Sequence, residues 1–234
     1  MKKWLNGVHV PHCKNTAEAA PVPMTPSAQV VLPMSMHIGR PAVPLVKVGD
    51  TVKVGQKIAE AGGFISANVI CSVSGTVKGI EPRLMANGSM VQSIIVENDG
   101  EYRTVEGFGQ KRDYTALSKQ EIRDIVKEAG IVGLGGAGFP TNVKLAPKNE
   151  EEIDYVIVNG AECEPYLTSD HRIMVENAEQ IVDGIALAMK ASGVACAKVG
   201  IEDNKPDAIA AMREAASGRQ NIEVVSLPAR YPQG

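Results

Sequence analysis

The sequence predicts an α/β protein with a mainly parallel sheet, preceded by a smaller all-β domain. Seven of the 14 prolines lie between Pro11 and Pro44, where they disfavour helix because each removes a backbone donor and restricts the preceding residue. Short β-rich runs broken by Gly, Asp and Asn follow, and then strand and helix patterns alternate. The predicted segments are an extended proline-rich lead at 1–40, the all-β domain at 41–100, a linker at 101–115 and the α/β domain at 116–234.

The all-β domain contains a weak internal repeat. Its predicted strands are 43–48, 51–54, 70–80 and 91–96. Val48-Gly49-Asp50-Thr51-Val52-Lys53-Val54 is echoed by Val73-Ser74-Gly75-Thr76-Val77-Lys78-Gly79, which predicts a quasi-twofold sandwich. These two turns resemble the biotinyl/lipoyl-like barrel-sandwich hybrid. Carrier domains of that family hold their cofactor on a lysine between the turns, but 64–68 contains none, so the domain is predicted to dock or pack rather than to carry a group.

The α/β domain has clear local signals. Ser118-Lys119-Gln120-Glu121 matches a capping box and predicts a helix that ends near Gly130. Further on we expect a strand at 153–158, one long helix after Asp170, a strand at 197–201, a helix at 206–216 and a strand at 222–227.

Composition excludes several classes of function. A net charge of -3 with both signs dispersed offers no basic stripe, so nucleic acid is not expected as a partner. The apolar runs are shorter than the roughly 20 residues that span a bilayer, and the N-terminus lacks a signal core, so we expect no direct membrane insertion and a cytoplasmic location. No C-x-x-C pair occurs and the histidines lack metal-ligand spacing, so no metal site is predicted.

A glycine-rich loop is the most informative segment. Five glycines occur in nine residues from Gly130 to Gly138, and glycine lets a backbone approach a ligand closely and turn its N–H groups onto a phosphate. Because the loop follows a helix, it is not the strand–loop–helix fingerprint of dinucleotide-binding folds. Spacing alone leaves a nucleotide loop and a structural turn both open.

An acidic loop follows the predicted strand at 153–158. It reads Asn159-Gly160-Ala161-Glu162-Cys163-Glu164-Pro165-Tyr166, and ligands in α/β proteins bind at the carboxyl ends of parallel strands. Taken alone, this pattern is also typical of a solvated acidic turn.

Together the two loops resemble the flavin-binding subunit of respiratory complex I. The Gly7-Val8-His9 opening, the barrel-sandwich hybrid and the wording Ala161-Glu162-Cys163-Glu164-Pro165-Tyr166 are similar to the C-subunit family of the Rnf electron-transport complex. One position departs, since complex I relatives carry Asp where this chain has Ala161. The resemblance implies cofactor-binding residues that contact FMN or NADH: Gly133, Gly135, Gly136, Gly138, Phe139, Lys144, Asn159, Glu162 and Glu164.

The resemblance also implies a reaction and partners. The family binds FMN non-covalently and oxidises NADH by hydride transfer to the flavin, with no protein acid or base and hence no catalytic residue. It then passes single electrons toward two 4Fe-4S clusters that lie beyond the residues present here. NAD(H), ferredoxin and the other Rnf subunits are the implied partners, and the implied location is peripheral, on the cytoplasmic face of the membrane.

Tyr231-Pro232-Gln233-Gly234 begins a second glycine and acidic loop in the family. The resemblance therefore predicts that the chain ends inside its nucleotide site and binds FMN weakly or not at all by itself. Two alternatives stay open. A cobalamin reductase shares the glycine loop and its lysine, and a non-catalytic assembly module would use the β domain for docking.

Overall fold

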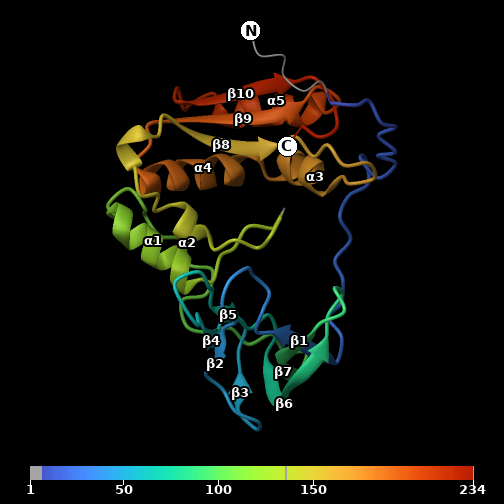
Figure 1. Ribbon diagram of the computed structural model, residues 1–234, viewed down its shortest axis with the longest axis vertical. Coiled ribbons are helices and arrows are strands. Elements are labelled where there is room, and N and C mark those ends of the chain that lie inside the picture. The colour runs from blue at the N-terminus through green and yellow to red at the C-terminus, as the bar shows by residue number, and fades with distance from the viewer. Residues whose placement is uncertain (1–6, 135, 234) are drawn as a thin grey trace. The chain divides into compact units, whose positions relative to one another are not determined.

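A computed structural model describes residues 7–134 and 136–233 (Figure 1). The chain divides into two compact units. The β unit is Met24–Pro147, and the α/β unit joins the segment up to Pro23 with the residues from Lys148 onward. This division groups the start of the predicted lead with the α/β unit, and groups 116–147 with the β unit.

The β unit contains two antiparallel sheets with strand orders β1-β7-β6-β3 and β2-β4-β5. Its strands are β1 (Gln29–Pro33), β2 (Val43–Pro44), β3 (Thr51–Val52), β4 (Lys57–Glu60), β5 (Val69–Ile70), β6 (Gly75–Leu84) and β7 (Met90–Asn98). The core includes Val52, Ile58, Val77 and Ile94, all with no exposed surface. Each such side chain contributes about 1.5–3 kcal/mol through removal of its apolar surface from water.

The two halves of the sequence repeat pair with each other. Thr51 lies opposite Thr76, its equivalent in the repeat, in the antiparallel pair of β3 and β6. Val77 accepts a hydrogen bond from Gly49 N–H and donates its own N–H to Asp50. Antiparallel pairing of equivalent residues places a local twofold axis between Thr51 and Thr76, as the repeat predicted.

Helix α1 (Lys119–Glu128) is part of the β unit and is attached to it by hydrogen bonds at its C-terminal end. Its N-terminus has the predicted capping box between Ser118 and Glu121. At the other end, the Asn68 side chain donates to the carbonyls of Lys127 and Glu128, at 3.2 and 3.3 Å. Asn68 is the last residue of the 64–68 stretch that lacks a carrier lysine, and its side chain therefore caps the C-terminal end of α1. A short helix, α2 (Thr141–Lys144), follows in the same unit.

The α/β unit is built on a parallel sheet of order β10-β9-β8 (Figure 1). Its elements are the 3-10 turn η1 (Glu150–Glu152), β8 (Tyr155–Gly160), α3 (Ser169–Glu176), α4 (Ala178–Ser192), β9 (Cys196–Glu202), α5 (Pro206–Ala216) and β10 (Ile222–Leu227). Buried side chains of β9, α4 and α5, such as Ile201, Val182 and Met212, form its core. This core supports the loops at the carboxyl ends of the strands.

Some predicted elements need correction. The single long helix after Asp170 is two helices, because Asn177 adopts a non-helical backbone with φ -133° and ψ 32°. The predicted strand at 70–80 is divided between β5 and β6. Strand β4 was not predicted, and the strand expected at 43–48 is limited to β2.

Candidate functional site

The glycine loop is closed at its base and exposed at its tip. Val132 and Pro140 form an antiparallel bridge, and Gly133 N–H donates to the carbonyl of Phe139 at 2.9 Å. At the tip, the side chain of Leu134 is 94% exposed and Gly136 is also exposed. Gly135, one of the predicted flavin residues, lies outside the described residues.

Lys144 lies over the glycine loop. A Cβ added to Gly133 would be 2.5 Å from Lys144 Nζ, so the space that a side chain would occupy holds an ammonium group. A Cβ at Gly136 would meet nothing within 4 Å, which leaves that part of the backbone open to a ligand. A flexible glycine backbone beside a lysine ammonium is an arrangement suited to a phosphate group.

Gly138 is held against residues 36–38 of the β unit, which follow β1. Its φ is +64°, and an added Cβ would lie 3.0 Å from both the carbonyl oxygen of Met36 and the Cα of His37. Ile38 N–H donates to the Ala137 carbonyl at 3.1 Å, and His37 Nε2 accepts from Ala67 N–H. The glycine loop is therefore anchored by residues 36–38, which carry no sequence signal for such a role.

The two carboxylates of the acidic loop have opposite environments. Glu162 is 6% exposed and has φ +48°, and its Oε1 accepts hydrogen bonds from Asp170 N–H and His171 N–H at the start of α3. Glu164 is exposed. Asn159 is exposed as well, and its Oδ1 accepts from Ala161 N–H at 3.1 Å. Asn159, Glu164 and Tyr166, which is also exposed, are thus side chains of this loop that a ligand can reach directly.

Two lysines that sequence analysis missed hold the acidic loop. Lys14 Nζ lies 3.3 Å from the Glu162 carboxylate. Lys205 has no exposed surface and donates to the Ala161 carbonyl at 2.7 Å and to Asn204 Oδ1 at 2.9 Å, with Glu202 Oε2 at 3.4 Å. Burial, and then the nearby charge of Lys14, lowers the pKa of Lys205. Lys205 lies three residues after the end of the parallel strand β9, which was an available signal; Lys14 had none.

Asp170, at the start of α3, lowers the stability of the folded protein at pH values where its carboxyl is charged. Its pKa is raised, first because partial loss of water around the carboxyl disfavours its charged form and then because Glu162 and Glu164 repel its charge. A raised folded-state pKa favours folding below the unfolded-state pKa of 3.8, and that contribution is lost as pH rises through the folded-state value.

We therefore expect Asp170→Asn to melt at a higher temperature than the parent chain at neutral pH. The difference should shrink as pH falls through the raised folded-state pKa of Asp170 and be lost by the unfolded-state value of 3.8. Thermal melts across pH measure it. Asp154→Asn, at an exposed carboxyl before β8, is the control. A lower melting temperature for Asp170→Asn at neutral pH would mean that attraction to the N-terminus of α3 outweighs the repulsion.

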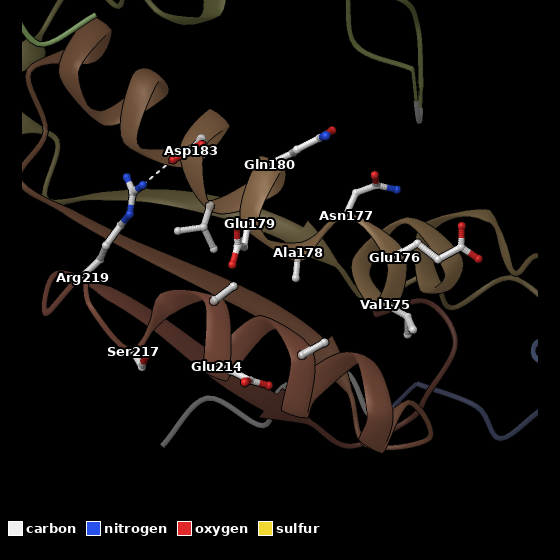
Figure 2. A pocket seen from close by; sticks show the side chains of 13 residues that line it. Val175, Glu176, Asn177, Ala178, Glu179, Gln180, Asp183, Glu214, Ser217 and Arg219 are labelled. Atoms are coloured by element: carbon white, nitrogen blue, oxygen red, sulfur yellow. Dashed lines mark hydrogen bonds and ion pairs between the residues drawn. The ribbon is translucent and has the colours of Figure 1, made fainter. Parts of the chain in front are cut away.

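A separate pocket lies between the start of α4 and the end of α5 (Figure 2). It has a volume of about 670 Å³ and is lined by acidic side chains that include Glu179 and Glu214. An ion pair between Asp183 and Arg219 closes one side, as the dashed line in Figure 2 shows. None of the predicted flavin residues lines this pocket, so it is not the predicted nucleotide site.

Two features that would indicate other functions are absent from the described residues. Within 7–134 and 136–233, no group of three or more His, Cys, Asp or Glu side chains is arranged to hold a metal ion. Within the same residues, no helix has the length and apolar character needed to cross a bilayer.

Comparison with known proteins yields two family matches. Residues 2–101 match the RnfC barrel sandwich hybrid domain, and residues 126–234 match the Nuo51 FMN-binding domain. Both agree with the predicted succession of a barrel-sandwich hybrid and a complex-I-flavoprotein-like α/β domain, so this fold prediction is confirmed.

Curated relatives align along almost the whole chain. The C subunit of the proton-translocating ferredoxin:NAD(+) oxidoreductase complex of Clostridium ljungdahlii is 45% identical over 100% of this chain and 51% of its own length. The C subunit of the Na(+)-translocating complex of Acetobacterium woodii is 45% identical over 97% of this chain and 52% of its own. The C subunit of the ion-translocating oxidoreductase complex of Pseudomonas aeruginosa is 42% identical over 97% of this chain and 30% of its own. The chain thus spans about half the length of the first two relatives.

Proposed function

The chain belongs to the RnfC family, and on that premise we propose that it is the FMN-binding, NADH-oxidising portion of the C subunit of an ion-translocating ferredoxin:NAD(+) oxidoreductase complex. The match to the Nuo51 FMN-binding domain supports FMN as the cofactor, since it covers the glycine loop and the acidic loop. The names of the relatives support membership of a complex with several subunits.

One observation carries the cofactor assignment. Lys144 Nζ occupies the space above Gly133 that a Cβ would fill, next to a glycine-rich tip that is open around Gly136. FMN has a phosphate dianion, and an ammonium with nearby glycine N–H groups is chemically matched to it. The residues present therefore fit the cofactor.

We assign the glycine loop and Lys144 to the phosphate and ribityl chain of FMN, and Asn159 to the isoalloxazine. Glu162 would act through the shape of its loop, because its carboxylate is already engaged by Lys14 and by the amides of α3. Phe139 would stack on NADH, and the exposed Glu164 would accept hydrogen bonds from the NADH ribose. When bound, FMN would supply the hydride-accepting chemistry and release single electrons toward the 4Fe-4S clusters expected in the longer relatives.

The proposal extends to the partners and the location. NAD(H) and ferredoxin are the proposed redox partners, and attachment to the cytoplasmic face of the membrane would come through other Rnf subunits.

The test is a titration of apoprotein with FMN, followed by quenching of flavin fluorescence. It is done with the chain alone and with a chimaera that continues after residue 234 with the corresponding C-terminal portion of the Clostridium ljungdahlii relative. The Kd for FMN is compared between the two forms, and a lower Kd for the chimaera would show that the added residues contribute to the FMN site.

In whichever form binds more tightly, we expect Lys144→Met to raise the Kd for FMN about 10- to 100-fold, since a hydrogen bond to a charged group contributes about 1.5–3 kcal/mol. Lys53→Met removes an exposed lysine of the same unit and should leave the Kd unchanged. Absence of FMN binding in both forms would overturn the proposed function, and an unchanged Kd for Lys144→Met would overturn the role given to that residue.

A further inference from the structure

The N-terminal segment lies along the acidic loop, although about 150 residues separate them in sequence. Tyr166 N–H donates to the His12 carbonyl at 3.0 Å. The Thr16 and Thr168 hydroxyls are 2.7 Å apart, and Arg172 Nη1 donates to the Ala17 carbonyl at 3.3 Å. These contacts hold Lys14, in the middle of the segment, directly beside the loop.

The Lys14 ammonium is surrounded by oxygen atoms of this one loop. It donates to the carbonyls of Glu162 at 2.8 Å, Glu164 at 3.2 Å and Leu167 at 2.5 Å, and lies 3.3 Å from Glu162 Oε2. The side chain is 10% exposed, so these bonds form largely away from water. Four acceptors share three N–H groups, and the loop thereby satisfies the cation completely.

The same contacts explain why the loop keeps an unfavourable backbone. Glu162 has φ +48° and Tyr166 has φ +71°, and a non-glycine residue in this region costs about 1–2 kcal/mol. Three carbonyl oxygens and a carboxylate also converge on one point, where their negative ends repel each other unless a cation lies between them. A hydrogen-bonded ammonium at that point offsets both costs.

The segment that Lys14 shapes carries Glu162 and Glu164 and begins three residues after Asn159. We propose that Lys14 is a positioning residue of the flavin site: its ammonium fixes the conformation of 162–167 from within, and so sets where the loop presents its ligand-binding groups. This inference rests on the proposed function, because it assumes that the loop binds FMN. It goes further in giving the N-terminal segment, ahead of the barrel-sandwich hybrid, a part in cofactor binding.

The experiment compares Lys14→Met, Lys14→Arg and a matched control, Lys198→Met. Lys198 is in the same unit, but its side chain is 38% exposed and its carboxylate partner is Glu223 at 2.9 Å. For each variant, in the form of the protein that binds FMN more tightly, the Kd for FMN is measured by fluorescence quenching. Hydrogen exchange of the apoprotein is measured at 162–171 and in β9 (Cys196–Glu202).

For Lys14→Met we expect a Kd for FMN about 10- to 100-fold higher, because the loop whose shape we assign to FMN binding loses the ammonium that holds Glu162 in place. Exchange should accelerate at 162–171 and stay unchanged in β9. Lys14→Arg keeps the charge and the donors, so it should bind within about threefold of the parent chain. Lys198→Met should match the parent in the Kd for FMN and in exchange at 162–171.

The outcomes separate the inference from the function on which it rests. If the parent protein binds FMN and Lys14→Met binds equally well, the inference is overturned and the proposed function stands. Acceleration of exchange in β9 to the same extent as in the loop, without rescue of the Kd by arginine, would assign Lys14 to general stability and also overturn it. If the parent protein binds no FMN, the proposed function falls and the inference with it.

Discussion

Replacement of Lys205 by methionine is expected to lower the free energy of unfolding of the α/β unit by about 3–5 kcal/mol. Lys205 and Glu202 are 0% and 1% exposed at their side chains, with Nζ and Oε2 3.4 Å apart. Methionine fills a similar volume but removes the cation, which leaves a buried carboxylate without its partner. The carbonyl of Ala161 also loses a 2.7 Å hydrogen bond.

Denaturant-dependent hydrogen exchange at β9 amides measures this effect in the α/β unit separately. Lys198→Met, which removes a solvent-exposed ion pair, should cost no more than about 1 kcal/mol. The double variant Lys205→Met with Glu202→Gln removes the buried negative charge as well and should recover part of the loss. A single-variant loss below about 1 kcal/mol would show that Lys205 is already largely neutral in the folded protein.

The second large effect is expected for Gly75→Ala in the β unit. A Cβ there would lie 1.9 Å from the carbonyl oxygen of Glu97, closer than any non-bonded contact allows, and Gly75 has φ +153°. The backbone has little freedom to move, since Gly75 is paired with Val52 of β3 and Asn98 of β7. Strain and displacement together predict a loss of about 3–6 kcal/mol.

Gly88→Ala is a matched control that measures the cost of a positive φ without a steric clash. Gly88 has φ +83° in the turn between the same strands β6 and β7, and its added Cβ would meet nothing within 4 Å. Its cost should be about 1 kcal/mol, which reflects the dihedral angle alone. Chemical unfolding, monitored by hydrogen exchange of the β7 amides, compares the free energies of unfolding of the two variants. Equal losses would contradict the assigned clash with Glu97.

Sequence analysis succeeded where a local signal determines the structure. The capping box starts α1 as expected, and α5 and β10 have the predicted bounds. Pro206 begins a helix, and the β-branched segment 222–227 lies between Asn221 and Pro228. The break at Asn177 was missed because asparagine also occurs within helices, so the sequence gives no local signal that separates α3 from α4.

The site was predicted less completely because much of its support is non-local. The two loops were recognised from their residues, but Lys14 reaches its partners across roughly 150 positions, and no pattern around it predicts a buried ammonium. Glu162 was expected to contact the flavin directly, yet its carboxylate is used by Lys14 and by α3. Whether Gly133, Lys144 and Asn159 contact the cofactor stays a prediction.

The discontinuity of the α/β unit has a consequence for the order of folding. During synthesis the segment that contains Lys14 emerges first, but its partners around Glu162 and Tyr231 appear only after the whole β unit has been made. The β unit, Met24–Pro147, is continuous and can fold as soon as it is complete. Once it has folded, it shortens the flexible path between the separated pieces, so the loop-closure entropy of joining them falls. The N-terminal segment therefore remains without its partners until the β unit and the acidic loop have been synthesised, and the acidic loop acquires its shape after the β unit can already fold.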